Sequence, residues 1–378
     1  MSKKKILIFI DWYLPGYRAG GPIRSCANMV SHLSGEFDFF IVTRDTDYMQ
    51  ADSYENIIKE EWNLLEDGSK VFYIPEKKIS RQIFKTIIQQ IKPDVIYLNG
   101  IFSYWFTITP LKIIDKKAIK AIISVRGMLA TGALAIKSLK KKIFLSYAKI
   151  RGLYDNVIFQ VSSIEEKEQT KKIFPFSTII VAPNLSCKQE PVSSSRIVKN
   201  AGELHLLNIA RIATEKNLIF ASEILKNVKG NVTFDFFGPI YDHNYWKKCL
   251  DSIQELPANI KVTYKGIAEQ KNVFSLLRQY HFLFLPSNGE NFGHIILESF
   301  SSGLPVIISD KTPWRGLASK NCGWDISLDN PKQFVEAIEK CIVMGNDEYH
   351  SMSKNAHKIA EEYINDEQKV NATRQLFS

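Results

Sequence analysis

The stretch from residue 282 to residue 308 constrains the fold of this chain more than any other segment. It opens with Phe-Leu-Phe-Leu-Pro at 282–286, a short apolar run ended by proline, which is typical of a buried strand. A polar loop follows, then a short helix predicted to begin just after Glu290 and to stop at Gly303, and then the apolar run Val-Ile-Ile at 306–308. Strand, helix and strand in this order predict a βαβ unit, whose parallel strands hold ligands at their carboxyl ends.

Two carboxylates, Glu290 and Glu298, stand eight positions apart in this unit, the first in the loop and the second in the second helical turn. Asn291, Phe292 and Gly293 are predicted to open the helix, where backbone N–H groups and the helix dipole favour an anion. Gly293 would let a ligand approach the backbone closely. The spacing fits a sugar and a ribose held on either side of a phosphate, and it fits two exposed glutamates equally well.

Strand and helix signals alternate along both halves of the chain. In the first half they give strands at 6–10, 37–43, 94–98 and 119–125 and helices at 22–33 and 81–91. After a weak segment at 192–200, interpreted as a linker, they give strands at 204–209, 232–237 and 260–264 and helices at 217–226 and 246–254. This alternation predicts the α/β class, with two Rossmann-like domains in tandem. We expect domains at 1–188 and 189–363, a last helix at about 353–363, and a tail at 364–378.

Composition and cysteine usage predict a cytoplasmic protein. The 378 residues are 45% hydrophobic, enough for two cores, but Asp11 interrupts the first apolar run too early for a signal peptide. No apolar stretch approaches the roughly 18–20 residues that span a bilayer. The five cysteines are odd in number and lack a C-x-x-C pair, which indicates reduced thiols. The Asp-Thr-Asp at 45–47 is interpreted as a polar loop, and we expect no metal site.

The net charge of +9 comes from the first half of the chain. Residues 1–190 hold 28 Lys and Arg against 19 Asp and Glu, whereas residues 191–378 hold 21 of each. Residues 112–151 alone carry eleven basic residues and one acid, Asp115. This asymmetry predicts that the first domain faces an anionic partner.

An apolar stripe runs through the same basic segment. Its members are spaced by 4, 4, 3 and 4 residues, as on one face of a helix: Leu139, Ile143, Tyr147, Ile150 and Tyr154. One interpretation is a surface helix that buries this stripe against the first domain. The lysines of 137–151 would then form a cationic patch for anionic lipid headgroups, at the inner face of the plasma membrane, or for a pyrophosphate-linked acceptor.

Several motifs, taken in order, resemble those of the family 4 retaining glycosyltransferases, which have the GT-B fold. Residues 290–298 resemble the family's Glu-x7-Glu motif, and Arg211 with Glu215-Lys216-Asn217 resembles its Gly-Arg…Glu-Lys-Asn segment. Weaker matches are the Gly238-Pro239 strand end, Val181-Ala182-Pro183-Asn184 at the end of the first domain, and the pair Gly20-Gly21. The resemblance covers most of the chain.

The resemblance implies two Rossmann-like domains that face each other across a cleft, with the C-terminal tail returning to the first domain. The first domain would bind the acceptor and the second a nucleotide-sugar. The implied reaction moves a sugar, from a UDP-sugar on family frequency, to a glycan acceptor with retained anomeric configuration. It would need neither metal nor cofactor. A lipid-linked saccharide in surface polysaccharide synthesis agrees with the basic first half.

The resemblance also assigns roles in the second domain. Charge develops on the leaving diphosphate, so preorganised cations there contribute most to catalysis, and Arg211 and Lys216 would supply them. Glu290 would contact the donor sugar and Glu298 the ribose. Gly238 is a further expected donor-binding residue. The base would be recognised through backbone contacts near Gly266 and Ile267.

In the first domain the sequence departs from the family pattern. Arg126 stands where many members carry the His of Ser-x-His-Gly, and a permanent cation cannot act as a general base. Arg126 would instead bind phosphate or a sugar hydroxyl. Gly20 and Gly21 either form an ordinary turn that needs positive φ or let the backbone approach the donor. Asn184 is interpreted as a hinge residue.

Two other functions remain open from the sequence. A GT-B nucleotide-sugar epimerase would need first-domain acids and a histidine-bearing site, and neither can be located. A non-catalytic protein could use its basic half to bind a membrane or nucleic acid. Two observations argue against nucleic-acid binding. The basic stretch carries no recognised module or aromatic RNP-like motif, and a binding protein would have no need for Glu290.

Overall fold

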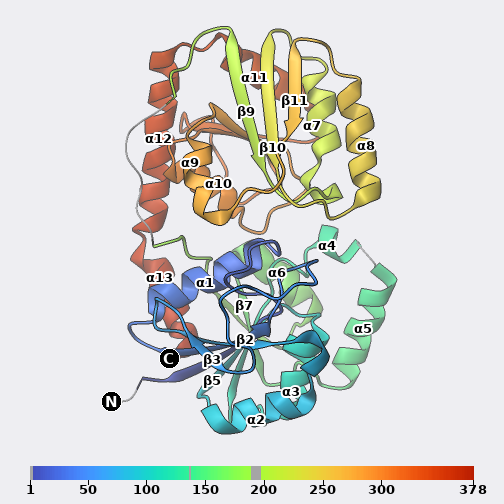
Figure 1. The fold of residues 1–378 in the computed structure, drawn as a ribbon, viewed down its shortest axis with the longest axis vertical. Coiled ribbons are helices and arrows are strands. Elements are labelled where there is room, and N and C mark those ends of the chain that lie inside the picture. The colour runs from blue at the N-terminus through green and yellow to red at the C-terminus, as the bar shows by residue number, and fades with distance from the viewer. Residues whose placement is uncertain (1–2, 136–137, 189–196) are drawn as a thin grey trace. The chain divides into compact units, whose positions relative to one another are not determined.

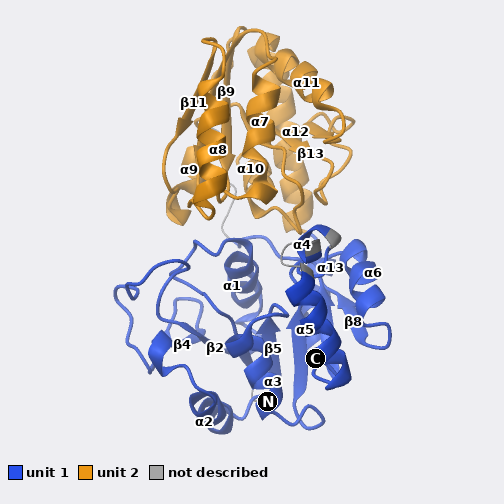
Figure 2. Ribbon diagram, turned by 90° about the vertical axis from the view of Figure 1, so that its right-hand side faces the viewer, with its two compact units in different colours: residues 1–188, 366–378 blue, residues 189–365 orange. Residues whose placement is uncertain are grey.

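The chain forms two compact units in the computed structural model, which describes residues 3–135, 138–188 and 197–378. One unit comprises Met1–Lys188 and Asp366–Ser378, and the other Gln189–Asn365 (Figure 2). Of the expected linker, residues 192–196 lie outside the described ranges, and residues 197–200 belong to neither helix nor strand.

Unit 1 is built on an eight-stranded sheet, as far as its described residues go. The strand order is β3-β4-β2-β1-β5-β6-β7-β8. The strands are β1 Lys5–Phe9, β2 Asp38–Arg44, β3 Trp62–Leu64, β4 Lys70–Ile74, β5 Val95–Asn99, β6 Lys120–Ser124, β7 Val157–Val161 and β8 Thr178–Val181. Neighbours are parallel except for β3, which pairs antiparallel with β4 at the edge. The four strands expected in this half match β1, β2, β5 and β6 within one residue at each end.

Helices cover both faces of that sheet (Figure 1). They are α1 Gly21–Leu33, α2 Arg81–Ile91, α3 Thr109–Ile113, α4 Thr131–Ala135, α5 Ser138–Ile150, α6 Ile164–Ile173 and α13 Glu367–Phe377, with short helical turns η1 Glu76–Lys78 and η2 Tyr104–Ile108. Side chains of a strand alternate between faces, so β1 feeds two cores. Leu7 and Phe9 pack with Phe84 of α2, whereas Ile6 and Ile8 pack with Val30 of α1.

The last helix of the chain, α13, belongs to unit 1. Its Phe377 is fully buried and meets the rings of Phe37, Phe39 and Tyr97 edge-on, at centroid distances of 5.5, 6.0 and 5.9 Å. Arg374 forms an ion pair with Glu36 in the turn between α1 and β2. The C-terminus therefore contributes directly to the core on the α1 face of the sheet.

Unit 2 has a wholly parallel sheet of six strands within its described residues, in the order β11-β10-β9-β12-β13-β14. The strands are β9 Glu203–Ile209, β10 Asn231–Phe237, β11 Ile260–Tyr264, β12 Phe282–Leu285, β13 Val306–Ser309 and β14 Gly323–Ile326. The helical elements are η3 Thr214–Lys216, α7 Leu218–Leu225, α8 His243–Gln254, η4 Gln270–Asn272, α9 Val273–Leu277, α10 His294–Ser301, α11 Pro331–Val343 and α12 Asn346–Ile364. The predicted class, α/β with two parallel sheets, is confirmed.

Three expectations about helices are wrong. The last helix of unit 2, α12, begins at Asn346 and not near residue 353, because the chain turns at Gly345 directly after α11. The helix after Glu290 begins only at His294. The stripe on α5 is not buried: Leu139, Ile143, Tyr147 and Ile150 are exposed, and only Tyr154 lies in the core.

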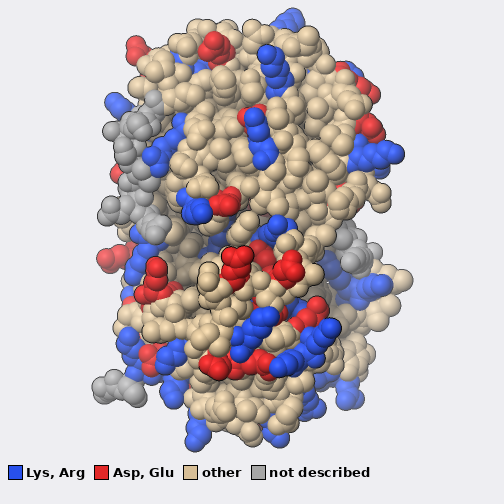
Figure 3. Space-filling model, in the orientation of Figure 1, with Lys and Arg blue, Asp and Glu red and all other residues tan. Residues whose placement is uncertain are grey.

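None of the helices in the described ranges combines the length and the apolar character needed to cross a lipid bilayer. On the face shown in Figure 3, basic and acidic side chains are interspersed over unit 1. The positive surplus of this half is therefore not one uniform patch on that face.

Candidate functional site

The candidate site of unit 2 lies where β9 and β12 end. Arg211 follows β9 by two residues, Lys216 ends the turn η3, and Glu290 lies in the loop after β12. Strands β9 and β12 are hydrogen-bonded neighbours and run parallel, so their carboxyl ends meet at one edge of the sheet. Three residues that the sequence predicted for one site are thus brought together.

Lys216 and Glu290 form an ion pair, with 2.5 Å between Nζ and Oε1. Both side chains are largely buried, at 18% and 11% exposure. A charge that leaves water needs a close partner, and here each supplies one to the other. The ammonium expected to face a diphosphate is therefore held beside the carboxylate expected to face the sugar.

Arg211 has partners of its own. Its guanidinium donates to Glu215, with 2.7 Å from Nε to Oε1, and lies over the ring of Tyr241 at 5.2 Å. Burial acts to lower the pKa of Arg211, but Glu215, Tyr241 and Glu290 together outweigh it and raise that pKa. The guanidinium is fixed as a cation, and its side chain is still 38% exposed.

The two loops that carry these charges are tied together by hydrogen bonds. Asn288 donates its backbone N–H to the carbonyl of Glu215 (2.8 Å) and its side-chain amide to the carbonyl of Thr214 (3.0 Å). Asn217 donates to the carbonyl of Pro286 (3.1 Å), and the N–H of Glu290 donates to the carbonyl of Lys311 (2.9 Å). The loops that carry the cations and the carboxylate are therefore held in place by hydrogen bonds to backbone carbonyls, and such fixed positions are what preorganisation requires.

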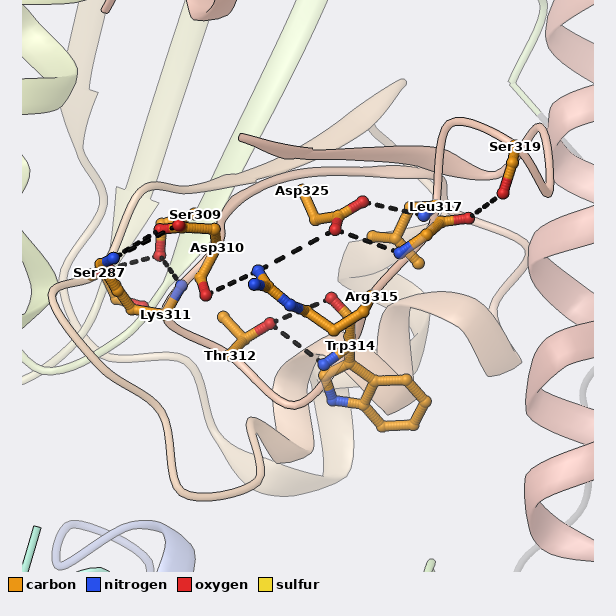
Figure 4. A network of polar contacts seen from close by, with 11 residues as sticks. Ser287, Ser309, Asp310, Lys311, Thr312, Trp314, Arg315, Leu317, Ser319 and Asp325 are labelled. Atoms are coloured by element: carbon orange, nitrogen blue, oxygen red, sulfur yellow. Dashed lines mark hydrogen bonds and ion pairs between the residues drawn. The ribbon is translucent and has the colours of Figure 1, made fainter. Parts of the chain in front are cut away.

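The carbonyl of Lys311 that accepts from the N–H of Glu290 belongs to the loop after β13. This loop has a polar network of its own (Figure 4). The carboxylate of Asp325 accepts from the backbone N–H groups of Gly316 (3.1 Å) and Leu317 (2.8 Å). Arg315 donates to the carbonyl of Asp310 at 2.6 Å and lies 3.9 Å from Asp325. The network fixes the segment whose Lys311 carbonyl holds Glu290.

Helix α10 begins three residues later than predicted because Gly293 takes a left-handed conformation, φ 75° and ψ 63°, and caps it. This positive φ favours glycine, because an L side chain in that conformation is strained. Phe292 is buried, and its carbonyl accepts from the indole of Trp314 at 2.7 Å. Asn291 and Phe292 thus precede the helix, and Glu298 does lie in its second turn.

Gly238 has a packing reason to be glycine. It follows β10 with φ 152°, and a Cβ there would lie 1.9 Å from the carbonyl oxygen of Ala210. The N–H of Gly238 donates to the carbonyl of Gly266 at 2.8 Å. The N–H of Ile212, next to Arg211, donates to the carbonyl of Pro239. Gly238 and Gly266 therefore position the backbone on which Arg211 stands. The contact expected between Ile267 and a base stays a prediction.

In unit 1, Arg126 is the centre of a polar network. Its three nitrogens donate to Asn99 Oδ1 (3.0 Å), Asn184 Oδ1 (2.5 Å) and the hydroxyl of Tyr97 (3.1 Å). The hydroxyl of Tyr97 donates in turn to Gln160 at 2.7 Å. The geometry shows Arg126 joining strand ends of unit 1, and its predicted contact with the donor stays a prediction.

The glycine pair begins helix α1. Gly20 is the residue before the helix, with φ 76°, and Gly21 is its first residue, followed by Pro22. No atom lies within 4 Å of a Cβ built on Gly20, so the constraint there is the backbone angle and not space. The positive φ of Gly20 agrees with the interpretation of the pair as a turn. Its predicted approach to the donor stays a prediction.

The Asp-Thr-Asp segment serves the loops around it. Asp47 accepts backbone N–H groups of Tyr17 (3.0 Å) and Tyr48 (2.7 Å), and Asp45 accepts the hydroxyl of Ser53 at 2.7 Å. Both aspartates are buried. Within the described part of the chain, no group of three or more His, Cys, Asp or Glu residues is placed to hold a metal ion.

A cluster at the carboxyl ends of β1 and β2 was not predicted. Asp11 lies 3.7 Å from Arg44, whose guanidinium covers the rings of Trp12 (5.7 Å) and Phe106 (5.4 Å). Burial raises the pKa of Asp11, against the opposing effect of a hydrogen bond from Ser103 and of the charge of Arg44. These residues come from three separate segments, and no motif joins them in sequence.

Residues 189–359 match the family model described as glycosyl transferases group 1. The matched segment contains Arg211, Lys216, Glu290 and Glu298. Among curated proteins, one relative is the GtfA subunit of the UDP-N-acetylglucosamine–peptide N-acetylglucosaminyltransferase of Streptococcus agalactiae. It is 28% identical over 173 residues, which are 43% of this chain and 33% of that protein. The similarity thus spans about a third of the relative's length.

Solved structures resemble the chain over nearly its full length. Sucrose-phosphate synthase of Thermosynechococcus elongatus has a TM-score of 0.76 at 14% identity, covering 100% of this chain and 98% of its own. Anabaena Alr3699/HepE, in complex with UDP and glucose, has a TM-score of 0.69 at 14% identity, covering 99% and 98%. The likeness shows that the chain has the GT-B fold expected from its motifs.

Proposed function

We propose that this chain is a glycosyltransferase that moves a sugar from a UDP-sugar to a saccharide acceptor with retained anomeric configuration. One observation carries the proposal: Arg211, Lys216 and Glu290 meet at the carboxyl ends of two neighbouring strands. All three lie in the segment that matches the group 1 glycosyl transferases. The choice of UDP draws on the names of the similar proteins, which include a UDP-N-acetylglucosamine enzyme and a complex with UDP.

Lys216 would exchange partners when the donor binds. The diphosphate would replace Glu290 beside the ammonium, and Glu290 would then accept hydrogen bonds from hydroxyls of the donor sugar. Arg211 already has a fixed, partly exposed guanidinium, whose donors suit a phosphate oxygen. Two cations against one diphosphate would stabilise the charge that develops as the sugar leaves.

The transfer itself would break the bond between the anomeric carbon and the β-phosphate oxygen. A new bond would form from that carbon to a hydroxyl oxygen of the acceptor, and the hydroxyl proton would leave with the diphosphate. Glu298, in the second turn of α10, would hold the ribose, and the backbone before α10, at Asn291 to Gly293, would face the phosphates. Gly266 and Ile267 would contact the base.

The acceptor proposed is a lipid-linked saccharide used in surface polysaccharide synthesis. Support comes from the surplus of basic residues in unit 1, which would attract a pyrophosphate-linked substrate. Asp11, Trp12 and Arg44 are candidates for contacts to it, since an aromatic ring beside polar groups suits a sugar. Arg211 and Lys216 would supply the positive charge at the diphosphate, so we propose that transfer needs no metal.

Thermal unfolding with UDP, GDP and ADP, each measured with and without a chelator, tests the donor site. A ligand at about 100 times its dissociation constant stabilises the folded protein by about 2.7 kcal/mol. We expect a shift in Tm with UDP that is lost in Glu298→Ala and kept in Glu255→Ala, an exposed glutamate of the same unit. A shift that disappears with the chelator would contradict metal independence.

Sugar transfer from UDP-sugars to a saccharide acceptor tests the chemistry. Glu290→Ala is expected to abolish transfer, because the variant lacks the carboxylate that would orient the sugar. Glu255→Ala is expected to leave it unchanged. Equal transfer by Glu290→Ala and the unmodified protein would overturn the proposed mechanism.

A further inference from the structure

Helix α5 of unit 1 exposes an apolar stripe to solvent. Leu139, Ile143, Tyr147 and Ile150 are 70%, 61%, 47% and 84% exposed. Their spacing of 4, 4 and 3 residues places them along one side of the helix. Figure 2 shows α5 on the outside of unit 1, facing the viewer.

The stripe is separate from the face by which α5 packs on its own unit. Leu145 and Ala148 are buried in the core on that side, and Phe144 packs against it. Lys141 also turns toward this side, where its Nζ lies 5.5 Å from the ring centre of Phe102. A helix of a globular chain needs only one apolar face for its own core, so the second face is available to a partner.

Exposed basic residues border the stripe on both sides. At about 100° per residue, Lys140 and Arg151 fall on one side of it and Lys142 on the other, whereas the Nζ of Lys149 lies 5.9 Å from the ring centre of Phe174 in the core. The helix Ser138–Ile150 contains no acidic residue. This arrangement suits a helix that lies flat on a membrane, because long Lys and Arg side chains reach headgroups while their neighbours enter the acyl layer.

A cationic pocket of about 360 Å³ adjoins the end of the stripe. Tyr147 lines it together with Lys112, Lys116 and Arg151. The Nζ of Lys116 donates to the carbonyls of Gly152 (3.1 Å) and Leu153 (3.0 Å), so its charge is held in place. Tyr147 thus connects an apolar surface with a pocket suited to a phosphate group.

We propose that unit 1 docks on the surface of an anionic lipid bilayer through α5, with the pocket beside Tyr147 taking the phosphate of one lipid. The stripe would enter the boundary between headgroups and acyl chains, and the flanking cations would face the lipid phosphates. With 13 residues, α5 is too short to span a bilayer, so the contact is peripheral. A second copy of the chain fits the stripe poorly, because pairing α5 with α5 would bring like charges together.

Vesicle flotation of the full chain, without nucleotide, tests the proposal. We expect binding to vesicles of phosphatidylcholine with phosphatidylglycerol, and much weaker binding to phosphatidylcholine alone. Removing apolar surface in Ile143→Ser/Ile150→Ser is expected to weaken binding about tenfold or more. Both residues are exposed, so the fold is preserved, and Val343→Ser, at an exposed residue of unit 2, is the matched control.

The charge and pocket contributions need separate variants. Lys140→Gln/Lys142→Gln is expected to weaken binding to anionic vesicles on the order of fivefold per cation, and the loss should shrink as salt rises. Lys112→Gln/Arg151→Gln tests the pocket, with Lys247→Gln/Lys248→Gln on α8 as control. If the control pair lowers binding as much as either test pair, the cause is net charge, and the assignment to α5 is overturned.

Two further outcomes would overturn the proposal. One is equal binding of Ile143→Ser/Ile150→Ser and the unmodified chain. The other is a dimer in sedimentation without lipid that these substitutions abolish, because the stripe would then face a second copy. The test is independent of sugar transfer: Glu290→Ala should float with the vesicles as the unmodified chain does, so failure of one proposal leaves the other standing.

Discussion

At the scale of single residues, the pair of Lys216 and Glu290 is central. The two side chains neutralise each other at 2.5 Å and are mostly buried. Exposed ion pairs contribute about 0–1 kcal/mol, whereas removing one member of a buried pair costs about 3–5 kcal/mol. A pair of intermediate burial should lie between these limits, so the same contact would stabilise the fold and set the charge of the candidate donor site.

Glu290→Gln and Lys216→Met are each expected to lower the free energy of unfolding by about 1–3 kcal/mol, because each leaves a largely buried charge unpaired. The double variant should lose less than the sum of the two. Urea unfolding of all four proteins measures this coupling. The exposed pair Lys226 and Glu255 gives a control cycle, in which we expect a much smaller coupling because both side chains face water. Additive losses at 216 and 290 would contradict the prediction.

At the scale of elements, many buried strands were predictable because apolar runs mark them, but β4, β7, β8 and β14 were not among the predicted strands. The edge strand β3 was missed, since Trp-Asn-Leu is only three residues long and no part of it is buried. The start of α10 was misplaced because nothing in the sequence shows that Gly293 takes a left-handed conformation. For α5, spacing predicted the helix and its stripe. It could not decide which of two apolar faces meets the core.

The candidate site shows the same limit. Motif spacing found Arg211, Lys216 and Glu290, but not Tyr241, which lies under the guanidinium and comes from the loop after β10. Nor could it show that the nitrogens of Arg126 donate to Asn99, Asn184 and Tyr97, because those residues meet only in the folded sheet.

Strands β9 and β12 are also joined at their other ends, by a histidine pair. The backbone N–H of His205 donates to Nδ1 of His281 at 3.0 Å, so that nitrogen is an acceptor and the proton of the neutral ring is on Nε2. Burial, followed by the nearby His205 and Lys199, lowers the pKa of His281 to about 4. Protonation would put a hydrogen where the backbone N–H now donates.

Acid is therefore expected to destabilise unit 2 through His281. Its folded pKa lies below the unfolded value of about 6.5, so its contribution is complete above pH 6.5 and is lost as the pH falls toward 4. The loss is on the order of 2–3 kcal/mol. Unfolding of His281→Asn, which keeps an acceptor near the place of Nδ1, should depend less on pH over this window. His243→Gln, at an exposed residue, should keep the pH dependence of the unmodified protein. Equal pH dependence of His281→Asn and the unmodified protein would contradict the assignment to His281.

At the scale of the whole molecule, the chain leaves unit 1 after Lys188 and returns to it at Asp366. The returning helix α13 ends in Leu376 and Phe377, both fully buried in the core on the α1 face of the sheet. We therefore expect folding of unit 1 to require α13, which follows unit 2 in the sequence. A defect there should affect unit 1 while leaving the proposed donor site intact.

Phe377→Ala is expected to destabilise unit 1 by about 3–5 kcal/mol, since it removes a buried ring that meets three other rings. Phe176→Ala is the matched control, because that ring is fully exposed, and it should change stability by less than about 0.5 kcal/mol. Limited proteolysis locates the effect: cleavage should rise within residues 1–188 in the variant, while UDP still protects fragments from residues 197–365. Increased cleavage confined to unit 2 would show that α13 supports the other unit.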